Sequence, residues 1–237
     1  MTNILFRSLF AGVVSLSLCG GAYAQNTPTT PPPAKDDHKD HDHSDHDHKD
    51  HKHDKKDKKK AETAKIGESA PEFALKDTTG KTVSLADFKG KIVVLEWFNA
   101  DCPFIVKHHK NATTFNDLHT KYNGKGVVFL AICSSAEGNQ GSGVERNAKA
   151  KTDFKMEYPI LMDADGKVGK TYGAKTTPHC FVIAADGKLV YNGAIDDDKS
   201  TDPAGKTNYV AKAIDELLAG KPVSTPTTKP YGCSVKY

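Results

Sequence analysis

Cys102 is the residue of this 237-residue chain whose type and place most clearly suggest chemistry. It stands between an apolar run and Pro103, where a buried strand is expected to turn into a helix, because proline suits the first helical position. A thiolate at such a corner faces free amide N–H groups and the positive end of the helix dipole, which stabilise the anion. The sequence therefore predicts that Cys102 is a nucleophilic thiol.

Glu96 is a second candidate, six residues before Cys102 in an otherwise apolar run. A carboxyl group in apolar surroundings can accept a proton from an attacking thiol. An unpaired buried charge is costly, so the alternative is that Lys107 or another basic residue pairs with it. His108 and His109 follow on the expected helix and are interpreted as surface residues.

Residues 35–60 are nearly all Asp, His and Lys, which makes this segment a low-complexity tract. A chain that carries several neutral imidazoles beside aspartates can bind zinc or copper without a preformed site. Metal chelation and a solvated tether are both compatible with this composition. The candidate metal ligands are His38, His41, His43, His46, His48, His51 and His53.

The elements that must position Cys102 are short apolar runs between turns. Residues 91–98 and 126–133 are predicted strands, buried on both faces of a sheet. A helix is predicted from Pro103 to about Tyr122, before the stop signal Asn123-Gly124. The order of elements indicates an α/β fold, with a mixed central sheet and helices on both faces. The other predicted elements are a turn and strand within 77–85, a helix near 144–154, a strand at 158–162, two strands around an Asp-Gly-Lys turn within 176–195, and a helix over 209–218.

Residues 1–24 have the order of a secretory signal peptide. Arg7 precedes a short apolar run, and the segment ends in Ala22-Tyr23-Ala24, which predicts cleavage after Ala24 and a periplasmic or secreted protein. A lipoprotein acylated at Cys19 is the alternative. The remaining predicted parts are a Pro-rich and then His/Asp/Lys-rich disordered tether (25–64), a folded domain (65–219), and a C-terminal tail that carries Cys233 (220–237).

Charge and hydropathy argue against nucleic-acid binding, against anion recognition by several arginines, and against a membrane span. The formal net charge is +3, and no segment is basic enough to indicate binding of nucleic acid. Arg7 and Arg146 are the only arginines, which excludes anion recognition by several arginines. No apolar run is long enough to predict a membrane span.

Several motifs together resemble a known family. The order of WFNADCPF (97–104), a TTP tripeptide (176–178) that opens a strand, and an Asp-Gly hairpin resembles the thioredoxin fold. Residues 70–98 resemble the redoxin branch, the family of alkyl hydroperoxide reductase, thiol-specific antioxidant proteins and exported thioredoxin-like proteins. The tail PYGCSVKY (230–237) resembles the end of a subset of exported redoxin-like proteins. The resemblance covers nearly all of 65–219 and implies a thioredoxin-like fold.

The resemblance also implies roles for residues around Cys102. Pro178 matches the family's cis proline, and the backbone of Thr177 would hold an extended substrate or partner against Cys102. Glu96 matches the buried acid beneath the active site. Ile105 stands where the family has its second cysteine, so the Cys-x-x-Cys dithiol is absent and a partner sulfur must come from elsewhere.

Cys233 is the best candidate for that partner sulfur. A mobile tail could bring it to an intermediate at Cys102 and close a disulfide. A fixed Cys102–Cys233 staple and pairing between chains are the alternatives. Cys133 is expected to be a small core residue. Cys180 could open onto the active-site corner or point into the core, and His179 is interpreted as a half-exposed turn residue.

Three functions are compatible with these residues. The first is an exported thiol-disulfide oxidoreductase that uses Cys102 and Cys233 on protein thiols or disulfides or on a small oxidised sulfur compound, with an unknown electron donor and no required cofactor. The second is a thiol peroxidase. Its usual pattern is broken here, because Asn99 stands where Thr or Ser is expected and Arg146 is the one arginine after the leader.

The third function is metal handling. In that hypothesis the histidine tract collects zinc or copper, and a cluster of Cys102, His179 and Cys180 holds the ion or passes it on.

Overall fold

The strand that leads to Cys102 lies inside a seven-stranded mixed sheet. A computed structural model describes residues 63–202 and 204–237. β3 (Ile92–Trp97) runs parallel to β4 (Val127–Cys133) and antiparallel to β7 (Cys180–Ile183), and β4 runs parallel to β5 (Ile160–Met162). The strand order is β2-β1-β5-β4-β3-β7-β8. The predicted α/β fold with a mixed sheet is confirmed.

The remaining strands are short and lie at the margins. β1 and β2 form a hairpin beside β5, and β8 pairs with β7 around the predicted Asp-Gly-Lys turn. β6 and β9 form a separate antiparallel pair. The bounds are β1 (Ala74–Asp77), β2 (Thr82–Ser84), β6 (Thr176–Thr177), β8 (Leu189–Gly193) and β9 (Cys233–Ser234).

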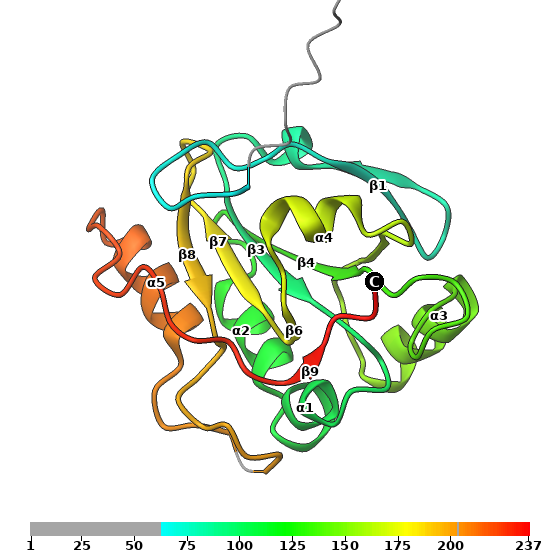
Figure 1. Ribbon diagram of the computed structural model, residues 1–237. Coiled ribbons are helices and arrows are strands. Elements are labelled where there is room, and N and C mark those ends of the chain that lie inside the picture. The colour runs from blue at the N-terminus through cyan, green and yellow to red at the C-terminus, as the bar shows by residue number, and fades with distance from the viewer. Residues whose placement is uncertain (1–62, 203) are drawn as a thin grey trace, which may run out of the picture. The chain divides into compact units, whose positions relative to one another are not determined.

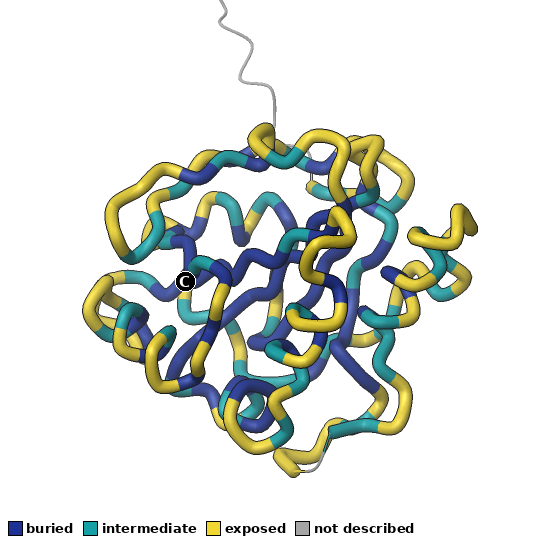
Figure 2. Tube along the Cα trace, turned by 180° about the vertical axis from the view of Figure 1, so that it is seen from behind, coloured by how far each residue is buried: buried dark blue, intermediate teal, exposed yellow. Residues whose placement is uncertain are grey.

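Helices cover both faces of the sheet because its strands are apolar on both faces. In β3, Val93, Leu95 and Trp97 face one core cluster, while Ile92 and Val94 face the other. Buried residues follow the central strands, and exposed residues follow the outer loops (Figure 2). The second cluster also contains side chains of α1 (Pro103–Val106), α2 (Thr114–Tyr122), α3 (Val144–Asp153) and α5 (Tyr209–Leu218), whereas the first contains side chains of η1 (Leu85–Phe88) and α4 (Lys167–Tyr172).

The helix predicted from Pro103 to Tyr122 is interrupted. α1 continues into a π-helical turn, η2 (Lys107–Asn111), and α2 starts only after Thr113, whose φ is +51°. The wider turn lets Lys107 and both following histidines point into the protein, where they find polar partners. The continuous-helix prediction is therefore wrong, because tertiary contacts override local helix preference in this segment.

The C-terminal tail crosses the molecule instead of leaving it. Figure 1 shows this red segment running from α5 past β8 and β6 towards the α3 side. The Asn192 N–H donates to the Pro226 carbonyl, and the Ala136 N–H donates to the Lys236 carbonyl. β9 and α4 were not predicted, because each is too short to produce a recognisable periodic pattern.

Several sequence predictions fall outside these residues. The signal peptide, the tether except for its last two residues (63 and 64), and all seven histidines of the tract lie outside the described part of the chain. Within 63–202 and 204–237, no helix combines the length and apolar character needed to cross a bilayer.

Candidate active site

Cys102 occupies the predicted corner between β3 and α1. It is the N-cap residue of α1, Pro103 is the first helical residue, and the cysteine is 0% exposed. Its side chain makes no capping bond to the helix amides; instead, the thiol donates a hydrogen bond to the Thr177 carbonyl oxygen at 3.0 Å. The predicted place of the thiol is confirmed, but its hydrogen bond is made to the facing loop.

That facing loop contains the predicted cis proline. The Thr177–Pro178 peptide bond is cis, and Thr177 is buried at the end of β6. Because the Thr177 carbonyl accepts the Cys102 thiol, this loop and the strand-helix corner form one site.

Cys233 lies at the same site, on β9. Cys233 is the register partner of Thr177, whose carbonyl oxygen accepts the Cys102 thiol, so both cysteines lie next to the same residue. Burial, together with the neighbouring Cys102, raises the pKa of Cys233 to about 11, so its thiol is protonated at neutral pH. All four described cysteines are free thiols.

The tail that carries Cys233 is docked, which corrects the expectation of a mobile segment. The Val235 N–H donates to the Lys175 carbonyl at 3.1 Å, and the Thr228 N–H donates to the Asn192 carbonyl at 3.2 Å. Backbone pairing of this kind satisfies donors and acceptors that a free tail would leave to water. As a result, β9 covers the Thr177 edge, and Cys102 is sealed beneath it.

Glu96 is buried on β3 and pairs with a basic residue, as the alternative prediction allowed, but that residue is His109 and not Lys107. Its Oε1 lies 2.8 Å from His109 Nε2, and its Oε2 accepts a hydrogen bond from the Tyr158 hydroxyl at 3.3 Å. Burial and the nearby Glu96 raise the pKa of Tyr158, so its hydroxyl keeps its proton. Lys107 is not the partner of Glu96: its Nζ donates to the carbonyl oxygens of the loop at Asp198 (2.8 Å) and Ser200 (3.0 Å).

The two helix histidines are buried, so their interpretation as surface residues is wrong. His108 is 0% exposed and His109 is 1% exposed. The His109 ring stacks on Phe115 and Phe154, with centroid distances of 5.0 and 5.6 Å. The reason is the π-helical turn, which directs both imidazoles inward to polar partners far away in the sequence.

His179 and Cys180 are also buried. His179 Nδ1 accepts a hydrogen bond from the Lys175 N–H, its Nε2 lies 2.6 Å from Asn192 Oδ1, and burial lowers its pKa to about 4. The half-exposed interpretation is therefore wrong. Cys180 lies in the core opposite Glu96, and burial raises its pKa. Cys133 is a core residue, as expected.

The folded metal cluster proposed from the sequence is not formed. Both ring nitrogens of His179 are engaged within the protein, and Cys180 packs in the core. Across the described ranges, no group of three or more His, Cys, Asp or Glu residues is arranged to hold a metal ion.

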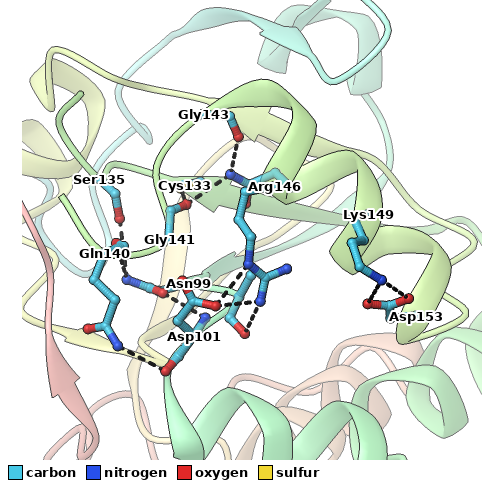
Figure 3. A network of polar contacts seen from close by, with 12 residues as sticks. Asn99, Asp101, Cys133, Ser135, Gln140, Gly141, Gly143, Arg146, Lys149 and Asp153 are labelled. Carbon is cyan, nitrogen blue, oxygen red and sulfur yellow. Dashed lines mark hydrogen bonds and ion pairs between the residues drawn. The ribbon is translucent and has the colours of Figure 1, made fainter. Parts of the chain in front are cut away.

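A polar network fixes the backbone just before Cys102 (Figure 3). Arg146 donates to the Asp101 carboxylate through Nε at 2.8 Å and through an Nη2 contact, and Nη2 also reaches the Ala100 carbonyl at 3.1 Å. Asn99 Nδ2 donates to the Gln140 carbonyl at 2.9 Å. This role of Arg146 was not predicted, although its being the one arginine after residue 7 was a signal.

Comparisons with known proteins indicate a family for this chain. Residues 65–209 match the Redoxin family model. A thiol-disulfide oxidoreductase ResA of Bacillus thuringiensis subsp. konkukian is 34% identical over 131 residues, which is 55% of this chain and 70% of that relative.

Solved structures give the same picture of the fold. An uncharacterized conserved protein from Geobacillus kaustophilus superposes with a TM-score of 0.66 and 32% identity, over 73% of this chain and 92% of that one. A structure titled as a thiol:disulfide interchange protein DsbE from Chlorobium tepidum has a TM-score of 0.50 and 23% identity, over 67% of this chain and 98% of that one. The latter shares the fold.

Proposed function

The chain belongs to the redoxin family and has its thioredoxin-like fold, and on that premise we propose that it is a thiol-disulfide oxidoreductase with Cys102 as nucleophile and Cys233 as resolving cysteine. The observation that carries the proposal is the meeting of the two cysteines at Thr177. The Thr177 carbonyl oxygen accepts the Cys102 thiol, and the register partner of Thr177 on β9 is Cys233. The tail thus supplies the second sulfur, which is missing from the usual place because Ile105 stands there.

The reaction needs two exchanges. The Cys102 thiolate attacks one sulfur of a substrate disulfide, forms a mixed disulfide and releases the other substrate sulfur as a thiolate. Cys233 then loses its proton and attacks Cys102 Sγ, so that the Cys102–Cys233 disulfide forms and the second substrate thiolate leaves. The substrate gains two electrons, and a dithiol donor restores the protein. The same steps in reverse oxidise a substrate dithiol, and none of them needs a cofactor.

Access to Cys102 requires the tail to move when the substrate is a protein. Thr177 and Pro178 form the edge that would hold an extended substrate, and β9 occupies that edge. In the proposed cycle β9 leaves the edge, a protein thiol or disulfide takes its place, and β9 returns with Cys233 to resolve the intermediate.

Glu96 is the proposed proton acceptor of this cycle. It is buried on β3, the strand that leads to Cys102, and two donors, His109 and Tyr158, hold its carboxylate oxygens. A carboxyl group held in this way can accept the proton that Cys233 must lose before it attacks.

Mapping of disulfides tests the proposal. After treatment of the purified chain with oxidised glutathione, we expect non-reducing peptide maps to show Cys102–Cys233. Cys233→Ser should stop at a Cys102–glutathione mixed disulfide, and Cys102→Ser should show neither product. Cys133→Ala, a change at a core cysteine, is the control that should behave as wild type. Free thiols at both positions, with no adduct on Cys102, would overturn the proposal.

A thiol peroxidase is the second candidate, and the full burial of Cys102 favours it because a small hydroperoxide needs less room than a protein. The Cys102 thiolate would attack the peroxide, giving a sulfenic acid and an alcohol, and Cys233 would then condense with it and release water. Peroxide consumption that is lost in Cys102→Ser, together with no reduction of protein disulfides, would select this candidate.

Export and metal binding are separate proposals that rest on the sequence before residue 63. The leader supports export to the periplasm or outside the cell, where disulfides persist. The histidine tract supports binding of zinc or copper. Zinc titration of the mature chain should show binding that disappears when residues 35–60 are deleted; unchanged stoichiometry would contradict it.

A further inference from the structure

One tail side chain, Tyr231, joins the strand of Cys233 to the helix that begins at Cys102. Tyr231 is two residues before Cys233 and is 7% exposed. Its ring packs edge-to-face on Phe104, two residues after Cys102, with a centroid distance of 5.8 Å. Lys107 Nζ lies 5.5 Å from the centroid of the same ring. Tyr231 therefore links the segments that carry the two sulfurs.

A chain of hydrogen bonds fixes the Tyr231 hydroxyl. The hydroxyl donates to the Asp196 carboxylate, so its 2.9 Å contact with His108 Nε2 requires that nitrogen to carry a hydrogen. His108 Nδ1 is then an acceptor and takes the Thr114 hydroxyl hydrogen at 3.1 Å. Burial lowers the pKa of His108 to about 4, which keeps the imidazole neutral as this arrangement needs. With this assignment, each donor among these hydrogen bonds meets one acceptor.

The partners of Tyr231 are fixed by residues outside the tail. The Gly205 N–H donates to Asp196 Oδ2 at 2.6 Å, and the Asp198 N–H donates to Asp196 Oδ1 at 3.1 Å. Lys107 ties this loop to η2 through the Asp198 carbonyl. The carboxylate and the imidazole thus form a socket that is built from the loop after β8 and from η2, and the tail inserts its tyrosine into it.

Between this socket and the Thr177 edge, the tail has little freedom. Cys233 is held on one side by pairing with Thr177 and on the other by Tyr231, with Gly232 as the single intervening residue. We propose that Tyr231, held by His108 and Asp196, is the positioning residue that sets the effective concentration of Cys233 at Cys102. Holding two reacting groups together raises their effective concentration without any change in their intrinsic reactivity. The proposal rests on the proposed roles of Cys102 and Cys233.

The equilibrium with glutathione measures this effective concentration. The protein dithiol reacts with one oxidised glutathione to give the protein disulfide and two reduced glutathione molecules, so the equilibrium constant has units of concentration. Tyr231→Phe keeps the ring and removes the hydroxyl, which leaves the buried Asp196 and the His108 N–H without their partner. We expect the constant to fall at least tenfold. The control, Tyr209→Phe on α5, should stay within twofold of wild type.

A second variant and a fold measurement keep the result interpretable. Asp196→Asn leaves the tail unchanged and should lower the constant in the same direction, so the test stands even if Tyr231→Phe folds poorly. A constant within twofold of wild type in both folded variants would overturn the proposal, even if their melting temperatures fall. The absence of any Cys102–Cys233 disulfide in the wild-type protein would instead overturn the proposed function.

Discussion

At the scale of single residues, a missing side chain lets the tail approach the strand-helix corner that carries Cys102. Gly232 has a φ of +126°, and a Cβ at this position would collide with the Thr177 carbonyl oxygen. The same oxygen accepts the Cys102 thiol. The Thr177 carbonyl therefore lies against both Cys102 and the tail, and only a glycine next to Cys233 leaves room for this.

Gly232→Ala should open the site. The added methyl group cannot fit against Thr177, so β9 is expected to leave β6 and expose Cys102. We expect iodoacetamide to alkylate Cys102 at least about tenfold faster than in wild type, equivalent to roughly 1.4 kcal/mol in the docking equilibrium. Peptide mass analysis under native conditions measures this rate.

Gly220→Ala is the matched control for that change. Gly220 also has a positive φ, +69°, but a Cβ there would meet no atom within 4 Å. Alkylation of Cys102 should keep its wild-type rate in this variant. Equal acceleration in both variants would mean that backbone strain in the tail, and not the contact with Thr177, controls access.

At the scale of elements, the insertion between β4 and α3 supports the strand-helix corner that carries Cys102. A Cβ at Gly141 would collide with the Asn99 side chain, and Asn147 Nδ2 donates to the Gly141 carbonyl at 2.9 Å. Arg146, on the first turn of α3, closes the network onto Asp101. The insertion and α3 thereby fix the backbone that presents Cys102.

Arg146→Gln should loosen this corner. Loss of the two-nitrogen contact with Asp101 is expected to lower the free energy of unfolding by about 1 kcal/mol, because charge-assisted bonds of this geometry are stronger than ordinary surface pairs. Lys149→Gln removes the exposed pair with Asp153 on the same helix and should lower the free energy of unfolding clearly less, because solvent screens exposed pairs. Urea denaturation measures both, and equal losses would contradict a special role for Arg146.

At the scale of the whole molecule, two buried imidazoles make the contacts of the tail and of the cis-proline loop dependent on pH. His108 holds Tyr231, and His179 holds Asn192 on β8; burial lowers the pKa of each to about 4. Both must take up a proton when the protein unfolds between pH 4 and 6.5. The two contacts are therefore sensitive to mild acid.

Stability should fall as the pH falls through this window. Above pH 6.5 the histidines are neutral in both states, whereas below it the unfolded state binds more protons than the native state. Each histidine can contribute a slope of up to about 1.4 kcal/mol per pH unit. Urea denaturation at several pH values from 7 to 4.5 measures the slope, which His179→Gln should reduce. An unchanged slope in His179→Gln would contradict the assignment.

Much of the fold could be predicted from local pattern. The continuous apolar runs of β3 and β4 indicated buried strands, Asp186-Gly187 indicated the β7–β8 turn, and α5 has the predicted bounds. These signals are local, because strand and helix periodicity require only neighbouring residues. The position of Cys102 and the cis loop at Pro178 followed from the same pattern combined with the family resemblance.

The sequence by itself therefore determined the strands, the strand-helix corner and the cysteine placed on it. Only the tertiary structure decided the fate of the polar residues around them: His109 pairs with Glu96, thirteen residues away, and His108 pairs with Tyr231, 123 residues away. The physical reason is that a buried polar side chain needs a specific hydrogen-bond partner, and the distance to that partner is set by topology. Local pattern gives no information about that partner. For the same reason, the docking of the tail as a strand could not be predicted from the sequence.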